Sequence, residues 1–103
     1  MVVLSVLYPN TSGSRFDESY YLATHIPLLR ARWDGMGLTE VRMLRGTATP
    51  AGSPVPYRFT TLLTFSSGEA LQGALSTHGA EILGDVPRFT DVQPLIQVND
   101  PVD

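Results

Sequence analysis

His25 and Tyr21 are the two residues of this sequence whose types and spacing best fit a chemical role. They lie four residues apart, which is about one turn of an α-helix. A neutral imidazole can accept or deliver a proton near pH 7, and a tyrosine hydroxyl one turn away can donate to a developing oxyanion. The pair predicts acid–base chemistry on a small molecule, with His25 as the acid or base and Tyr21 as its assistant.

A structural role for His25 is the alternative. Pro27 follows two residues later and has no backbone N–H, so one helical carbonyl is left without its donor. The imidazole can satisfy that carbonyl, and the residues alone leave both roles open. His78 stands near the expected end of a second helix, where the helix dipole favours a partly charged histidine. The two histidines have no partners at metal-ligand spacing, so no metal site is predicted.

The element that must carry this pair is a helix beginning at Asp17. Asp17 is a suitable N-cap, and Glu18 is favourable in the first turn. Gly35 and Gly37 predict the end of the helix. One stripe of apolar residues at helical spacing is expected to face a core, made of Leu22, Ile26, Leu29 and Trp33.

Tyr21 and His25 lie beside that stripe, about 60° away on a helical wheel. This position is the boundary between core and solvent, where a small ligand can enter. Tyr20 points nearly opposite the stripe and is expected at the surface. Pro27 predicts a kink or the start of a second short helix.

Four further segments have the β-branched, apolar composition of strands, and they cover residues 2–8, 38–49, 57–65 and 91–98. Pro94 lies inside the last segment and predicts an edge strand or a bulge. A second helix is expected from a capping box of Ser66 and Glu69 to about Thr77, where Gly79 interrupts it. The order of elements is β-α-β-β-α-β. It predicts a single α+β domain over residues 1–103 with the ferredoxin-like fold, a four-stranded antiparallel sheet with two helices on one face.

Three side chains on these elements are candidates for a substrate pocket. Trp33 and Phe65 can form an aromatic wall, and Met43 lies in the second strand. Core packing is the alternative for each of them. Asp85 and Asp91 are interpreted as turn and cap residues of the segment before the last strand.

The face of the sheet away from the helices is expected to need a cover. The strands carry apolar residues on both alternating sets, whereas a sheet with one wet face alternates apolar with polar residues. About eight such side chains would be exposed, and burying each one is worth ~1.5–3 kcal/mol. The summed free energy is comparable to the ~5–15 kcal/mol stability of a whole domain. A single chain of this length supplies no third layer. A homodimer with the sheets face to face is therefore predicted.

Composition excludes several classes of function. The net charge of −3 argues against a nucleic-acid partner and against binding to an anionic membrane surface. Cysteine is absent, which excludes disulfides, thiolate metal sites and cysteine nucleophiles. The apolar start of the chain is too short for a signal sequence or a membrane span, and a cytoplasmic location is expected.

Two motifs resemble those of the EthD family, named after a gene of ethyl tert-butyl ether degradation. The first is Phe16-Asp17-x-x-Tyr20-Tyr21-x-x-x-His25-x-Pro27-Leu28, and the second is Asp85-Val-Pro-Arg-Phe89-Thr90-Asp91 followed by Pro94 and Gln97. With Tyr8-Pro9 at the end of the first strand, the resemblance spans nearly the whole chain. It implies a dimeric α+β barrel, and it favours a functional role for His25, which belongs to the first motif.

The resemblance implies a class of ligand but no defined reaction. Relatives in the same superfamily include small-molecule isomerases, monooxygenases of aromatic polyketides and haem-binding proteins, and some fungal members are regarded as polyketide dehydratases or decarboxylases. We therefore expect a homodimer that binds or transforms a small aromatic or carbonyl-bearing molecule without a cofactor. A non-catalytic binding protein is one alternative. A haem binder with His25 or His78 as axial ligand is another.

Overall fold

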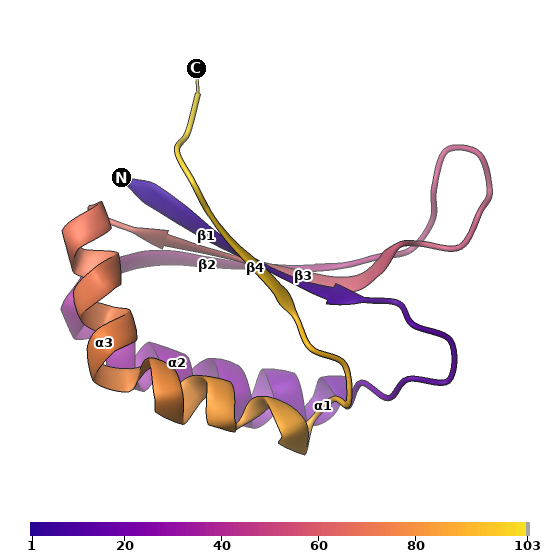
Figure 1. Ribbon diagram of the computed structural model, residues 1–103, viewed down its shortest axis with the longest axis horizontal. Helices are drawn as coiled ribbons and strands as arrows, with labels where there is room; N and C mark the ends of the chain where they lie inside the picture. The colour runs from indigo at the N-terminus through magenta and orange to yellow at the C-terminus, as the bar shows by residue number, and fades with distance from the viewer. Residues whose placement is uncertain (103) are drawn as a thin grey trace.

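Four strands form one antiparallel sheet in the computed structural model, which describes residues 1–102. The strand order is β2-β3-β1-β4, so β1 and β3 are central and β2 and β4 are the edges. Both helices, the one at residues 18–33 and the one at residues 68–84, lie on the same side of this sheet (Figure 1). The predicted α+β, ferredoxin-like arrangement is confirmed. The strands are β1 (Val2–Pro9), β2 (Leu38–Arg45), β3 (Tyr57–Phe65) and β4 (Leu95–Asn99).

The edge strands are shorter than their sequence pattern predicts. β2 ends at Arg45 rather than at Thr49, and β4 begins at Leu95 rather than at Asp91. Pro94 immediately precedes β4 and has no N–H to give to a ladder, which explains the later start. The predicted edge position of this last strand is confirmed, because β4 pairs with β1 alone.

The first helix is interrupted by a π-helical turn. It consists of α1 (Glu18–Tyr20), the π segment η1 (Tyr21–His25) and α2 (Ile26–Trp33), followed by the 3-10 turn η2 (Asp34–Met36). Asp17 caps it as predicted, and its carboxylate accepts from the Tyr20 N–H at 3.0 Å. In the π segment the Ile26 N–H bonds to the Tyr21 carbonyl, five residues back instead of four. Gly37 closes the element in the left-handed conformation, at φ 97°.

This π turn overturns two expectations about which residues face the core. Leu22 was expected in the buried stripe but is 42% exposed, while Tyr21 is 1% exposed and takes its place. Tyr20 was expected at the surface but is half-buried. The wider turn adds a residue to the helical repeat. An ideal α-helical wheel therefore gives wrong directions for the side chains at the start of this helix relative to those after the π turn. Tyr21 and His25 therefore share the inward face with Ile26, Leu29 and Trp33.

The second helix is longer and begins later than predicted. α3 runs from Gly68 to Gly84 without a break at Gly79, and the 3-10 turn η3 (Val86–Arg88) follows it. Its N-cap is Ser67, whose hydroxyl accepts from the Ala70 N–H at 3.1 Å, so the predicted Ser66 capping box is wrong. A glycine inside a helix costs about 1 kcal/mol. That cost is smaller than the free energy gained by burying Ile82, one turn further along the helix.

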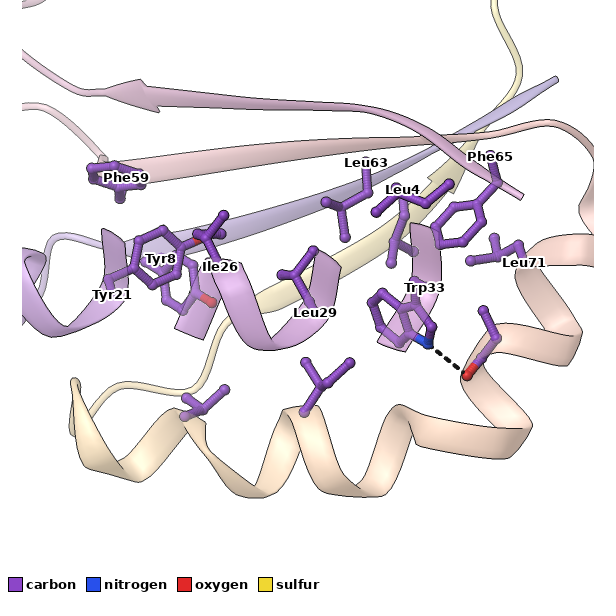
Figure 2. Close-up of a cluster of buried hydrophobic side chains, with 14 of the residues drawn as sticks. Leu4, Tyr8, Tyr21, Ile26, Leu29, Trp33, Phe59, Leu63, Phe65 and Leu71 are labelled. Atoms are coloured by element: carbon purple, nitrogen blue, oxygen red, sulfur yellow. Dashed lines mark hydrogen bonds between the residues drawn. The ribbon is translucent and has the colours of Figure 1, made fainter. Parts of the chain in front are cut away.

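The core fills the space between the sheet and the two helices. Figure 2 shows side chains from the sheet and from the helices converging there. Trp33 ties the helices together, because its indole N–H donates to the Ala74 carbonyl of α3 at 2.9 Å, the dashed line in Figure 2. An exposed ion pair of Arg32 and Glu81 joins α2 to α3 on the outside. Within residues 1–102, the structure contains no helix long and apolar enough to cross a membrane.

Candidate functional site

A cavity of about 50 Å³ lies between the sheet and the helices. By volume it has room for about three to five water molecules. Its wall is apolar apart from a few polar groups, which are those of His25, Tyr8, Tyr21 and Thr61. An apolar hollow with a few convergent polar groups is the usual form of a small-molecule site.

His25 is buried in this wall and is hydrogen-bonded to a carboxylate. Its Nδ1 atom lies 2.9 Å from Oδ2 of Asp85, which stands 60 residues away at the end of α3. The imidazole is 3% exposed. Its ring stacks on Tyr21 at a centroid distance of 5.4 Å and contacts Phe89 at 4.7 Å. These contacts fix the plane of the ring and direct one nitrogen at Asp85.

The hydrogen bond to Asp85 determines which nitrogen of His25 carries the proton. A carboxylate only accepts, so Nδ1 of the neutral imidazole is the N–H donor. Nε2 then holds the lone pair, and it makes no hydrogen bond to any residue in the part of the chain the structure describes. Since His25 lines the cavity, Nε2 is the atom available to a ligand there.

Burial lowers the pKa of His25 below its ordinary value of 6.5, against the opposing effect of the Asp85 hydrogen bond and charge. The imidazole is therefore neutral at pH 7, which is the state of a general base. This arrangement of a carboxylate, an oriented imidazole and a free Nε2 is the geometry by which proteins prepare a histidine to take a proton.

Tyr20 holds the other oxygen of the same carboxylate. Its hydroxyl donates to Oδ1 of Asp85 at 2.9 Å, and Arg88 approaches that oxygen at 3.6 Å. Burial and the adjoining Asp85 raise the pKa of the Tyr20 hydroxyl, so it stays protonated and remains a donor. Asp85 thus sits between a tyrosine and a histidine with both oxygens engaged, which restrains its rotation.

Tyr21 and Thr61 form the second polar group of the cavity. Their hydroxyls are hydrogen-bonded to each other, and both residues are 1% exposed. Burial raises the pKa of Tyr21 to about 12. Burial and the neighbouring Tyr21 also raise the pKa of Tyr8. These phenols are protonated throughout the physiological range and can act only as neutral donors or acceptors.

The remaining candidates from the sequence have different positions. Trp33 lines the cavity. Phe65 is fully buried against Trp33, at 5.8 Å between ring centroids, and Met43 lies opposite Thr61 on β2, packed against the core. Neither Phe65 nor Met43 is among the described residues that form the cavity wall. His78 was expected at a helix end but lies within α3, 3.8 Å from Glu81.

Sequence reasoning missed Asp85, Tyr20 and Thr61 as parts of the site. Asp85 does occupy the turn predicted for it, as the C-cap of α3, but its carboxylate also orients His25. The second EthD-like motif begins at Asp85, which was the available signal. Thr61 sits among apolar residues on the inner face of β3, where a polar residue needs a partner.

The described residues do not fit a haem. The cavity of about 50 Å³ is far smaller than a porphyrin, and His78 is not among the residues of its wall. Among residues 1–102, no three His, Cys, Asp or Glu side chains gather as a metal site would need.

The fold and this buried site define a ferredoxin-like α+β protein. A protein of the dabb family with a ferredoxin-like fold, from Mesorhizobium loti MAFF303099, has the same architecture at a TM-score of 0.63 and 14% identity, over 99% of this chain and 97% of that one. An ethyl tert-butyl ether degradation (EthD) family protein from Bacillus halodurans C-125 matches at 0.79 and 23%, over 99% of both chains. These two show the fold.

Membership of a family comes from a stronger match. An EthD-like protein from Ralstonia eutropha JMP134 is 34% identical, with a TM-score of 0.90, over 99% of this chain and 92% of that one. The chain belongs to the EthD family, and the resemblance inferred from its motifs is confirmed. No protein-family model matches the chain, and no curated protein matches it.

Proposed function

We propose that this protein is an acid–base enzyme that acts on a small aromatic or carbonyl-bearing molecule, with His25 as its general base. The observation that carries the proposal is the hydrogen bond between His25 Nδ1 and Asp85, which leaves Nε2 unprotonated at an apolar cavity. A general base must be neutral, oriented and within reach of the ligand. The burial of His25 and its Asp85 contact support the first two requirements.

The reaction class that fits these groups is proton abstraction next to a carbonyl, or from a phenolic hydroxyl. His25 Nε2 takes the proton and becomes a cation that Asp85 stabilises. The negative charge left on the substrate oxygen needs a donor. If the Thr61 hydroxyl donates to Tyr21, the phenol proton of Tyr21 is free to point at that oxygen, and the cavity position of Tyr21 supports this role.

We also propose that two copies assemble through the outer face of the sheet. Alternation along the paired strands directs Val3, Leu7 and Leu62 to the side away from the helices. Leu44 and Leu95 join them from the edge strands, and both are about half exposed. Polar residues such as Thr60 and Thr64 interrupt this face, so it is less apolar than the sequence pattern predicts. Light scattering is expected to give twice the 11.2 kDa mass of one chain.

The catalytic role is tested by screening lactones, quinones and aromatic acids for stabilisation of the fold and for conversion, followed by mass spectrometry. The His25→Gln variant is expected to bind a hit and to lose its conversion by about a hundredfold or more. His78→Gln is the matched control, since His78 is the other histidine and lies outside the cavity. Conversion that survives in a folded His25→Gln variant contradicts the proposal.

A non-catalytic binding protein is the second candidate, and the largely apolar wall of the cavity favours it. Such a protein is stabilised by a ligand in proportion to the logarithm of its concentration. Stabilisation by a hit that is never converted, in the wild type as in His25→Gln, identifies this second function.

A further inference from the structure

A second hollow adjoins the cavity that His25 lines. It has a volume of about 420 Å³ and lies between the end of α3 and the segment that leads into β4. The two hollows adjoin one another, because four residues belong to the walls of both: Leu83, Val86, Pro94 and Ile96. We call this second hollow the α3–β4 groove.

The two hollows differ in size in a way that bears on the ligand. The inner cavity, at about 50 Å³, is smaller than the ~150 Å³ cavity that accommodates a benzene ring and takes only a small group of a ligand. Sites that bind whole small molecules commonly measure about 300–1,000 Å³. The α3–β4 groove falls in that range, whereas the inner cavity falls well below it. The groove is the adjoining space into which a larger ligand at His25 can extend.

Two large apolar side chains stand exposed where the hollows meet. Leu83 is 49% exposed and Ile96 is 46% exposed. They come from α3 and β4, on the two sides of the junction. Exposed apolar groups that border a pocket gain free energy when an apolar ligand covers them. Their position supports contact with the part of a ligand that lies outside the inner cavity.

Two of the three polar side chains in the groove wall, Asp91 and Thr90, are engaged by the protein, while the third, Gln93, makes no hydrogen bond among the described residues. Asp91 accepts from the Arg15 N–H at 2.9 Å. The Thr90 hydroxyl donates to the Arg15 carbonyl at 2.6 Å. Neither needs a polar group from a ligand. The groove therefore favours an uncharged, apolar occupant over a charged one.

We infer that the ligand of the His25 site has two parts, an end bearing a hydroxyl or carbonyl that enters the inner cavity and an apolar extension that lies in the α3–β4 groove. This inference rests on the proposed function, because it takes the polar end of the ligand to lie at His25. Leu83 and Ile96 then select for the extension, while His25 and Tyr21 contact the polar end.

The test uses a series of 4-alkylphenols, from phenol to 4-pentylphenol, as probes of the wild-type protein. Binding is followed by NMR at the His25 ring protons and at the methyl groups of Leu83 and Ile96. Affinity is expected to rise with chain length, by up to about fourfold for each methylene buried in the groove. Both sets of resonances are expected to shift together with the longer probes.

Two variants isolate the groove. Leu83→Gln keeps a good helix former but removes apolar surface, and it is expected to flatten the dependence on chain length. Val92→Trp fills the groove from a residue outside the inner cavity wall, and it is expected to weaken the long probes selectively. Leu22→Gln is the matched control, since Leu22 is an exposed leucine of η1 away from the groove, and it is expected to leave the series unchanged.

The outcomes separate this inference from the proposed function. Probes that shift His25 with equal affinity at every chain length overturn the two-part ligand and leave the proposed function standing. Long probes that shift Leu83 and Ile96 without any effect on His25 overturn the proposed function, and the two-part ligand with it. A series that binds nowhere overturns both.

Discussion

His25 Nδ1 and the Asp85 carboxylate lie 2.9 Å apart, although 60 residues separate them in the chain. One comes from the π segment of the first helix and the other from the end of the second. The contact forms only when both helices pack on the same face of the sheet. The fold therefore supplies the carboxylate that sets the tautomer and orientation of the histidine.

The Asp85→Asn variant is expected to lower the pKa of His25 further. Asp85 raises that pKa through its hydrogen bond and charge, in opposition to burial, and the amide keeps the shape but loses the charge. The measurement is an NMR titration of the His25 ring protons. Asp100→Asn, in the exposed tail, is the control. A His25 pKa that rises in Asp85→Asn contradicts the assignment of Asp85 as the hydrogen-bond partner of His25.

The Tyr20→Phe variant is expected to change the His25 pKa in the opposite direction. The Tyr20 hydroxyl donates to Asp85 Oδ1 and spreads the carboxylate charge. Without that donor, the carboxylate interacts more strongly with the imidazolium, so the pKa of His25 rises. The same titration measures the shift. A pKa equal to that of the wild type shows that Tyr20 has no influence on the pair.

The stability of the protein is expected to fall as the pH drops below about 6.5. Burial lowers the pKa of His25 from 6.5 in the folded state, so the unfolded chain binds more protons between that lowered value and 6.5. The free energy of unfolding is therefore full above pH 6.5 and declines as the pH falls through this window. Urea denaturation at a series of pH values measures it.

The control for this pH effect compares variants of the two histidines. His25→Gln is expected to remove the decline, and His78→Gln is expected to keep it, because these are the two histidines of the chain. The carboxylates Glu18 and Glu81 have a lowered pKa through Arg45 and Arg32, and their contribution is lost only below about pH 4.5. A decline near pH 6 that persists in His25→Gln has another origin.

Tyr21→Phe is expected to destabilise the fold by about 1–3 kcal/mol, because it leaves the buried Thr61 hydroxyl without its partner. Adding Thr61→Val removes that hydroxyl as well. The double variant is expected to be more stable than the sum of the two single changes implies. Thermal and denaturant unfolding of the four proteins give the coupling energy, and strict additivity would contradict a direct hydrogen bond.

Local patterns in the sequence predict the strands, the Asp17 cap and the fold because each depends on neighbouring residues. β3 runs from Tyr57 to Phe65, the bounds that the composition of this segment predicts. The π turn is different. It shifts Tyr21 inward and Leu22 outward, and no residue type marks it except Pro27 just beyond. A helical wheel assumes an uninterrupted α-helical repeat, so it cannot predict this shift.

The site is predictable only where its residues are close together in the sequence. His25 and Tyr21 share one helical turn, so their spacing alone places them together. Asp85 reaches His25 only through the packing of two helices, and Thr61 reaches Tyr21 from the sheet. Such contacts depend on the tertiary structure. The EthD-like motifs name the residues but do not state which side chains meet.

The proposed general base requires that burial keeps His25 neutral and that Asp85 fixes its proton on Nδ1, with a free lone pair on Nε2 at the cavity. The ¹⁵N chemical shifts of the His25 ring at pH 7 measure this directly and need no ligand. We predict a protonated Nδ1 and an unprotonated Nε2. A proton on Nε2, or an imidazolium with both nitrogens protonated, would contradict it.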